Sequence, residues 1–127
     1  MTVEQAIAAA DRMRPNNPFT TEDKYIWLRG CDVLIRAQVV NKSKTGDFEG
    51  VGADIVELDE MGETTLLLVP LPYDGLYPHY LAGQMDAALG ESDRAANELA
   101  QYNALLSGFS VWMRQTYLPA ANTKIKY

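Results

Sequence analysis

Hydrophobic positions along this chain recur mostly at intervals of three and four residues, the spacing of one face of an α-helix. Thr2 and Gln5 have the spacing of a capping box, and Thr20 or Thr21 can cap a second helix. The fold predicted from this pattern is mainly α, a helical bundle of about four helices. Its helices are expected at about residues 3–13, 21–40, 74–88 and 93–117.

The second and last predicted helices carry the longest apolar stripes. In the second helix the stripe is Leu28, Cys31, Ile35 and Val39. The last helix is the longest, roughly 37 Å at about 1.5 Å per residue. Its stripe is Leu99, Tyr102, Leu106, Phe109 and Met113. Gly108 interrupts this stripe at a cost of about 1 kcal/mol relative to alanine, and a close helix crossing would account for it.

The pattern changes between the second and third predicted helices. Residues 55–58 and 64–69 are richer in β-branched and large apolar side chains, and residues 59–62 between them have the composition of a turn. These features predict a small β-hairpin at about residues 53–69. Two strands alone are marginally stable, so this hairpin must lie on the helices or on a neighbouring subunit. Residues 120–127 are short and mixed in character, which indicates a flexible tail.

Composition narrows the class of protein. The chain has 127 residues, which fits one domain spanning residues 1–127. Its net charge of -6 argues against a protein that coats DNA. The single cysteine, Cys31, excludes an internal disulfide and a cysteine metal cluster. No apolar run approaches the roughly 18 residues needed to span a bilayer, so no membrane partner is expected.

The ionisable residues form no recognisable catalytic or metal-binding motif. His79 follows Asp74 by five residues, but no serine or cysteine motif accompanies the pair, which favours a structural role. Cys31 lies on an apolar stripe and reads as a core residue. The acidic residues between the second and third helices lack the spacing of a calcium loop; they are Asp54, Glu57, Asp59, Glu60 and Glu63. We therefore expect no enzyme, no cofactor and no metal, with a small ligand-binding or regulatory helical module as the alternative class.

Two groups of residues are candidates for contact with a partner protein. Tyr73 and Tyr77 are either interface anchors or core residues, and the sequence leaves both interpretations open. Asp74 lies between them and can also cap the third helix. The second group is in the tail, where a short segment could add a strand to a neighbouring subunit. Its residues are Lys124, Ile125 and Tyr127.

The C-terminal half carries a more specific pattern. It contains Val69-Pro70, then Pro72-Tyr73-Asp74, Leu76-Tyr77 and Tyr80-Leu81, followed by Asp86, Gly90-Glu91, Asp93-Arg94, Asn97, Asn103, Phe109 and Trp112. In this order the residues resemble the head–tail connector (head completion, adaptor) proteins of tailed phages and prophages. The N-terminal helices resemble that family only in layout. Ala95 and Ala96 stand where the family pattern has an aromatic and a polar residue, and Leu89 stands where it has a polar one.

This resemblance implies a virion protein at the head–tail junction, made in the cytoplasm of the bacterial host. It implies a homo-oligomer ring that assembles beneath the portal protein and binds a neighbouring connector, stopper or tail protein. Genome DNA would pass through such a ring without specific binding, because an acidic surface repels phosphates. A tail completion protein or another phage morphogenesis protein is the alternative within this class.

Overall fold

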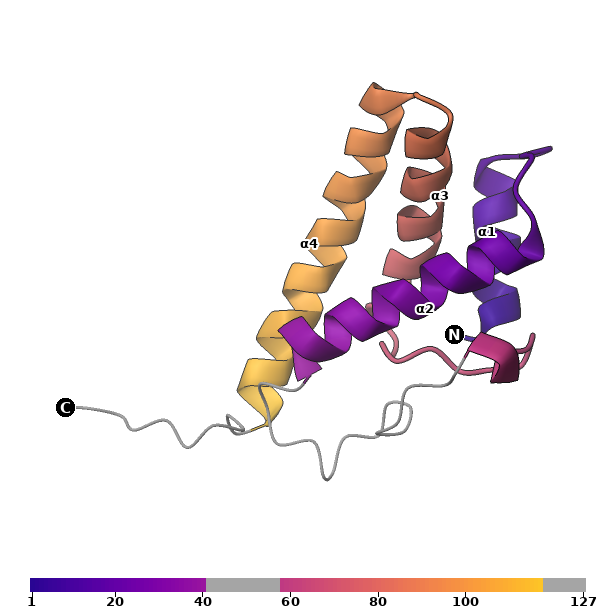
Figure 1. Ribbon diagram of the computed structural model, residues 1–127. Helices are drawn as coiled ribbons and strands as arrows, with labels where there is room; N and C mark the ends of the chain where they lie inside the picture. The colour runs from indigo at the N-terminus through magenta and orange to yellow at the C-terminus, as the bar shows by residue number, and fades with distance from the viewer. Residues whose placement is uncertain (41–57, 118–127) are drawn as a thin grey trace.

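The computed structural model describes residues 1–40 and 58–117, in which four α-helices pack together. They are α1 (Val3–Met13), α2 (Thr21–Gln38), α3 (Leu76–Ala88) and α4 (Ser92–Thr116), and a short 3₁₀ turn, η2 (Leu58–Glu60), precedes α3. Figure 1 shows α3 and α4 as an antiparallel hairpin, with α1 beside α3 and α2 crossing α1 and α3. The mainly α bundle predicted from the hydrophobic spacing is confirmed.

Side-chain caps fix the starts of the first two helices. The Thr2 hydroxyl accepts a hydrogen bond from the Gln5 amide at 3.2 Å, and the Gln5 side chain accepts one from the Thr2 amide at 2.9 Å. Thr20 and Asp23 form the same reciprocal pair at the start of α2. Such boxes satisfy two amides that have no partner inside the helix. The predicted capping at Thr2 and Thr20 is therefore confirmed.

The turn between α3 and α4 is built around Gly90. Its φ of 78° lies in the left-handed region that favours glycine. The Gly90 amide donates to the Ala87 carbonyl at 3.1 Å, and the Glu91 amide donates to the Asp86 carbonyl at 2.8 Å. This pairing is the Schellman arrangement that ends a helix. It reverses the chain within a few residues and lays α4 back along α3.

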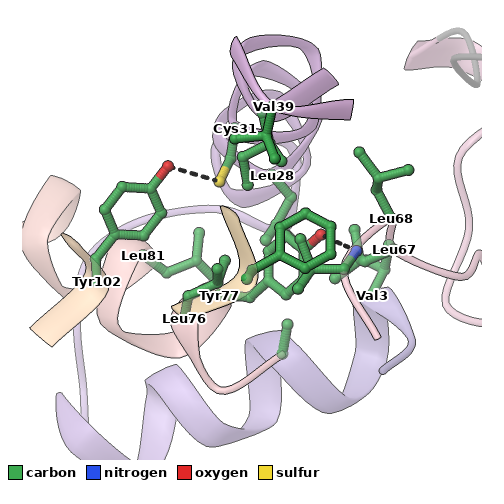
Figure 2. Packing of buried hydrophobic residues seen from close by; sticks show 14 of the residues in the cluster. Val3, Leu28, Cys31, Val39, Leu67, Leu68, Leu76, Tyr77, Leu81 and Tyr102 are labelled. Carbon is green, nitrogen blue, oxygen red and sulfur yellow. Dashed lines mark hydrogen bonds between the residues drawn. The ribbon is translucent and has the colours of Figure 1, made fainter. Parts of the chain in front are cut away.

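The predicted apolar stripes meet in one core. The α2 stripe is buried throughout, and Tyr102, Phe109 and Met113 are the fully or nearly buried members of the α4 stripe. Figure 2 shows side chains from α2 facing Tyr77 and Leu81 of α3, with Tyr102 reaching in from α4. Leu99 is 37% exposed, so the predicted apolar stripe does not extend to the start of α4, next to the α3–α4 turn.

The second strand of the predicted hairpin is not a strand. Residues 61–75, called here the connecting segment, consist mostly of turns and bends, pass beside the start of α1 and make a single isolated bridge, between Thr2 and Leu66. The Val3 amide donates to the Thr65 carbonyl at 2.9 Å, and the Leu67 amide donates to the Met1 carbonyl at 3.0 Å. Residues 58–60 form η2, and residues 53–57 of the predicted hairpin lie outside the described residues.

The reason for this difference lies in the burial pattern. Leu67, Leu68 and Val69 are consecutive and all buried, with exposures of 3%, 2% and 0%. A strand with one solvated face would bury alternate residues instead. Within the connecting segment these three residues are enclosed on both faces, although Leu66 and Leu71 are exposed. No β-strand occurs in residues 1–40 or 58–117.

Candidate functional site

Tyr73 packs on the second half of α4. Its ring centroid lies 6.1 Å from that of Phe109 and 6.5 Å from that of Trp112. A Cβ atom built on Gly108 would meet the Tyr73 ring at 3.0 Å. The glycine in the α4 stripe is thus explained by an aromatic side chain lying against the helix, and not by a close helix crossing.

Asp74 is nearly buried and does not cap α3. Its carboxylate lies 3.4 Å from the Met1 ammonium group. The position before the first residue of α3 belongs to Gly75, and no side chain caps that helix. The predicted capping role is therefore wrong. Asp74 instead links the connecting segment to the start of the chain through this ion pair.

Tyr77 is completely buried, which favours the core interpretation of the two left open by the sequence. Its hydroxyl accepts a hydrogen bond from the Val69 amide at 2.8 Å and donates one to Asp32 of α2 at 2.5 Å. The other Asp32 oxygen accepts from the Leu68 amide at 3.0 Å. Figure 2 shows the Tyr77 hydroxyl directed at the backbone nitrogen of the connecting segment. These contacts fasten that segment to α2 and α3.

Burial controls the ionisation of this cluster. It raises the pKa of Asp32 to about 6, against the lowering effects of the Tyr77 hydroxyl and the Leu68 amide. It also raises the pKa of Tyr77, and the nearby Asp32 charge adds to that effect. The thiol of Cys31 points at the Tyr102 hydroxyl at 3.8 Å, and burial raises the pKa of the thiol as well. Cys31 is a buried core residue, as predicted.

A second polar cluster joins the end of α1 to the α3–α4 hairpin. Arg14 donates to both oxygens of Asp86, at 2.8 and 2.7 Å, and to Glu98 at 2.6 Å. The other Glu98 oxygen lies 2.8 Å from Nδ1 of His79. The Arg14 hydrogen bond lowers the pKa of Asp86, although burial acts in the opposite sense. His79 therefore contacts Glu98, and the sequence-based pairing of His79 with Asp74 has no counterpart in these contacts.

The acidic residues that the structure describes remain apart from any metal-binding arrangement. Asp59, Glu60 and Glu63 are exposed. In residues 1–40 and 58–117 no group of three or more histidine, cysteine, aspartate or glutamate side chains is placed to hold a metal ion. Asp54 and Glu57 lie outside the described residues, as do the tail candidates Lys124, Ile125 and Tyr127.

The outer face of α4 differs from the rest of the surface in charge. Between Ala95 and Trp112 the single charged residue is Glu98, which turns inward to Arg14 and His79. The exposed side chains in this stretch are all uncharged: Ala96, Asn97, Leu99, Ala100, Gln101, Asn103, Ala104, Ser107 and Val111. We call them the uncharged face of α4. The scarcity of charged residues in this stretch can be read from the sequence, but only the structure shows which of its residues are exposed together.

Comparison of the chain with family models, with curated proteins and with solved structures finds no match. Among the described helices, none combines the length and apolar character needed to cross a membrane.

Proposed function

We propose that this protein is a non-enzymatic structural protein of a tailed phage or prophage, a head–tail connector subunit. Copies of the chain assemble as a ring at the portal, and the ring binds the next connector, stopper or tail protein. Support comes from the order of residues between Val69 and Trp112, which resembles that of connector proteins. The same residues build the α3–α4 hairpin and the segment packed on it.

The observation that carries this proposal is the uncharged face of α4. A helix exposed to water usually presents charged side chains on its outer face. This chain has 28 charged residues, 11 basic and 17 acidic, yet places none of them on that face. The centres of protein interfaces are likewise depleted of charged residues. This face runs from Ala96 to Val111, a length of roughly 24 Å at about 1.5 Å per residue.

Charge also indicates the occupant of this face. Two copies that each carry a net charge of -6 repel one another wherever acidic surfaces meet. Contact through the uncharged face keeps like charges apart, and the Asn and Gln amides can form hydrogen bonds across it. We therefore assign this face to contact between copies in the ring. The remaining acidic surface lets DNA pass through the ring without specific binding.

The test is assembly on the portal protein of the same phage, followed by light scattering and electron microscopy. We expect the purified protein to join the portal as a multi-copy complex. Ala100→Glu and Ala104→Glu place a carboxylate on the uncharged face and should reduce the bound copies at least about tenfold at equal concentration. Ala8→Glu is the matched control, because Ala8 is an exposed alanine on α1.

Failure of the unaltered protein to bind the portal would refute the connector function and favour a ligand-binding or regulatory module. Equal loss with Ala8→Glu would show that added charge in general, and not the α4 face, controls assembly.

A further inference from the structure

A surface hollow of about 620 Å³ lies where the first turn of α2 meets η2. Its lining combines two kinds of side chain. Tyr25 and Leu58 supply apolar surface, and Glu22 and Asp59 supply carboxylates, with Thr21 completing the wall. The volume is typical of a ligand-binding cleft. An apolar floor beside carboxylates suits a side chain with an aliphatic stem and a cationic end, which is the chemistry of lysine.

The last ten residues of this chain have the complementary composition. Residues 118–127 contain Lys124 and Lys126 and no acidic residue, although the whole chain carries a net charge of -6. Ile125 lies between the lysines, and Tyr127 follows them. The two lysines can therefore pair with the two carboxylates of the hollow, while the apolar residues beside them cover its apolar surface.

We propose that residues 124–127 of one copy dock in the hollow between α2 and η2 of a neighbouring copy. The lysine ammonium groups pair with Glu22 and Asp59, and Ile125 or Tyr127 covers Leu58 and Tyr25. This inference rests on the proposed assembly of copies, since the occupant belongs to a second subunit.

Chain length is the reason for assigning the tail to a neighbour. The hollow lies at the start of α2, whereas α4 ends on the opposite side of the molecule, near the end of α2 (Figure 1). The 18 residues of α2 cover roughly 27 Å at about 1.5 Å per residue. The seven residues from Tyr117 to Lys124 span at most about 24 Å when fully extended. Docking in the chain's own hollow would therefore require an almost fully extended tail and an extended lysine side chain, so we assign the tail to the hollow of an adjacent copy.

The first experiment measures docking without assembly. A fluorescently labelled peptide of residues 118–127 is titrated with the full-length protein, and its anisotropy is followed. We expect saturable binding that weakens at higher salt. Reversing both carboxylates, Glu22→Lys with Asp59→Lys, should weaken binding at least about tenfold, because two attractions become repulsions. Glu60→Lys is the matched control on η2, since Glu60 is exposed and does not line the hollow.

The second experiment uses reversed charges in whole chains. One variant carries Glu22→Lys and Asp59→Lys, and the other carries Lys124→Glu and Lys126→Glu. Each variant alone should bring fewer copies to the portal than the unaltered protein does. An equal mixture should restore the copy number, because every tail then meets a hollow of opposite charge.

The outcomes separate the two proposals. A peptide that does not bind, or binds the reversed hollow equally well, overturns the docking inference even if the ring forms on the portal. A mixture that fails to restore assembly also overturns it. Peptide binding that requires Glu22 and Asp59, in a protein that never joins the portal, supports the docking contact and refutes the connector function.

Discussion

Removal of one oxygen atom, the hydroxyl of Tyr77, is expected to destabilise the fold by about 3 kcal/mol. Tyr77→Phe leaves the Val69 amide without an acceptor in a completely buried position. An unsatisfied buried donor costs about 1–3 kcal/mol. The same change removes a hydrogen bond to the Asp32 carboxylate, a bond to a charged group that contributes about 1.5–3 kcal/mol.

Two features reduce the sum of these costs. Asp32 keeps the Leu68 amide as a donor. Its pKa is already raised to about 6, so it can take up a proton when a donor is lost. Phenylalanine fills the same space as the tyrosine ring, and no cavity opens. The net loss is therefore nearer about 3 kcal/mol than the full sum.

Urea unfolding at pH 7, followed by circular dichroism, measures this loss. With a slope of about 1–3 kcal/mol per molar urea, the midpoint should fall by about 1–3 M. Tyr73→Phe is the control, because the Tyr73 hydroxyl makes no hydrogen bond among the described residues; its midpoint should hardly move. A loss below about 1 kcal/mol for Tyr77→Phe would refute the bridging role of the hydroxyl. Normal stability with lost assembly would restore the interface interpretation of Tyr77.

Three further substitutions test other parts of the structure. Gly108→Ala should destabilise by about 1 kcal/mol, because the new Cβ presses on Tyr73; after Tyr73→Ala the same change should stabilise by about 1 kcal/mol, and the same sign in both backgrounds would contradict the packing argument. Asp32→Asn should gain stability relative to the unaltered protein between about pH 4 and pH 6, by about 2–3 kcal/mol. As pH rises through that window, the Asp32 carboxyl ionises in the unfolded chain before it ionises in the folded protein, so the unaltered protein loses stability. The measurement is the urea midpoint of both proteins from pH 3 to 8. Parallel curves for the two proteins would show that the pKa of Asp32 is not raised. Arg14→Ala should cost about 3 kcal/mol at pH 7 and less at pH 3, because burial without the arginine favours protonation of Asp86 in the variant, whereas exposed Arg12→Ala should have little effect at either pH.

The helices could be predicted because their signals are local. A threonine and a glutamine three residues apart satisfy each other's backbone amides, so the start of α1 needs no information from elsewhere in the chain. The α2 stripe is similar, since the spacing of Leu28, Cys31 and Ile35 places them on one face whatever they pack against. Predictions of this kind succeeded to within a few residues at the helix ends.

The connecting segment could not be predicted because its partners are distant in sequence. Its amides bind Asp32 and Tyr77, which lie on two different helices. Residues 64–69 have the composition of a strand. The burial of three consecutive residues, Leu67, Leu68 and Val69, is seen only in the structure and differs from the alternation of a half-exposed strand. One signal was available: Asp32 directly follows Cys31 in the α2 stripe, and an acidic residue beside buried positions needs hydrogen-bond donors.

The Arg14 cluster gave no sequence signal. Arg14 and Asp86 are separated by 72 positions, and Arg14 and Glu98 by 84. Each residue alone resembles an ordinary surface charge near a helix end. The structure shows that Asp86 is almost fully buried, with a side-chain exposure of 1%. Its pairing with arginine fixes the end of α1 against the hairpin that bears the uncharged face.

The two proposed contacts between copies should respond to salt in opposite directions. Contact along the uncharged face of α4 brings together molecules of net charge -6, so added salt strengthens it by screening their repulsion. Docking of Lys124 and Lys126 against Glu22 and Asp59 is an attraction between opposite charges, so added salt weakens it. The tail leaves one side of the molecule and its hollow lies on another, which makes the contact heterologous, and such contacts close into rings only when the rotation between copies allows it. A tail-deleted protein should therefore assemble better as salt rises, while the full chain should show a weaker or reversed dependence.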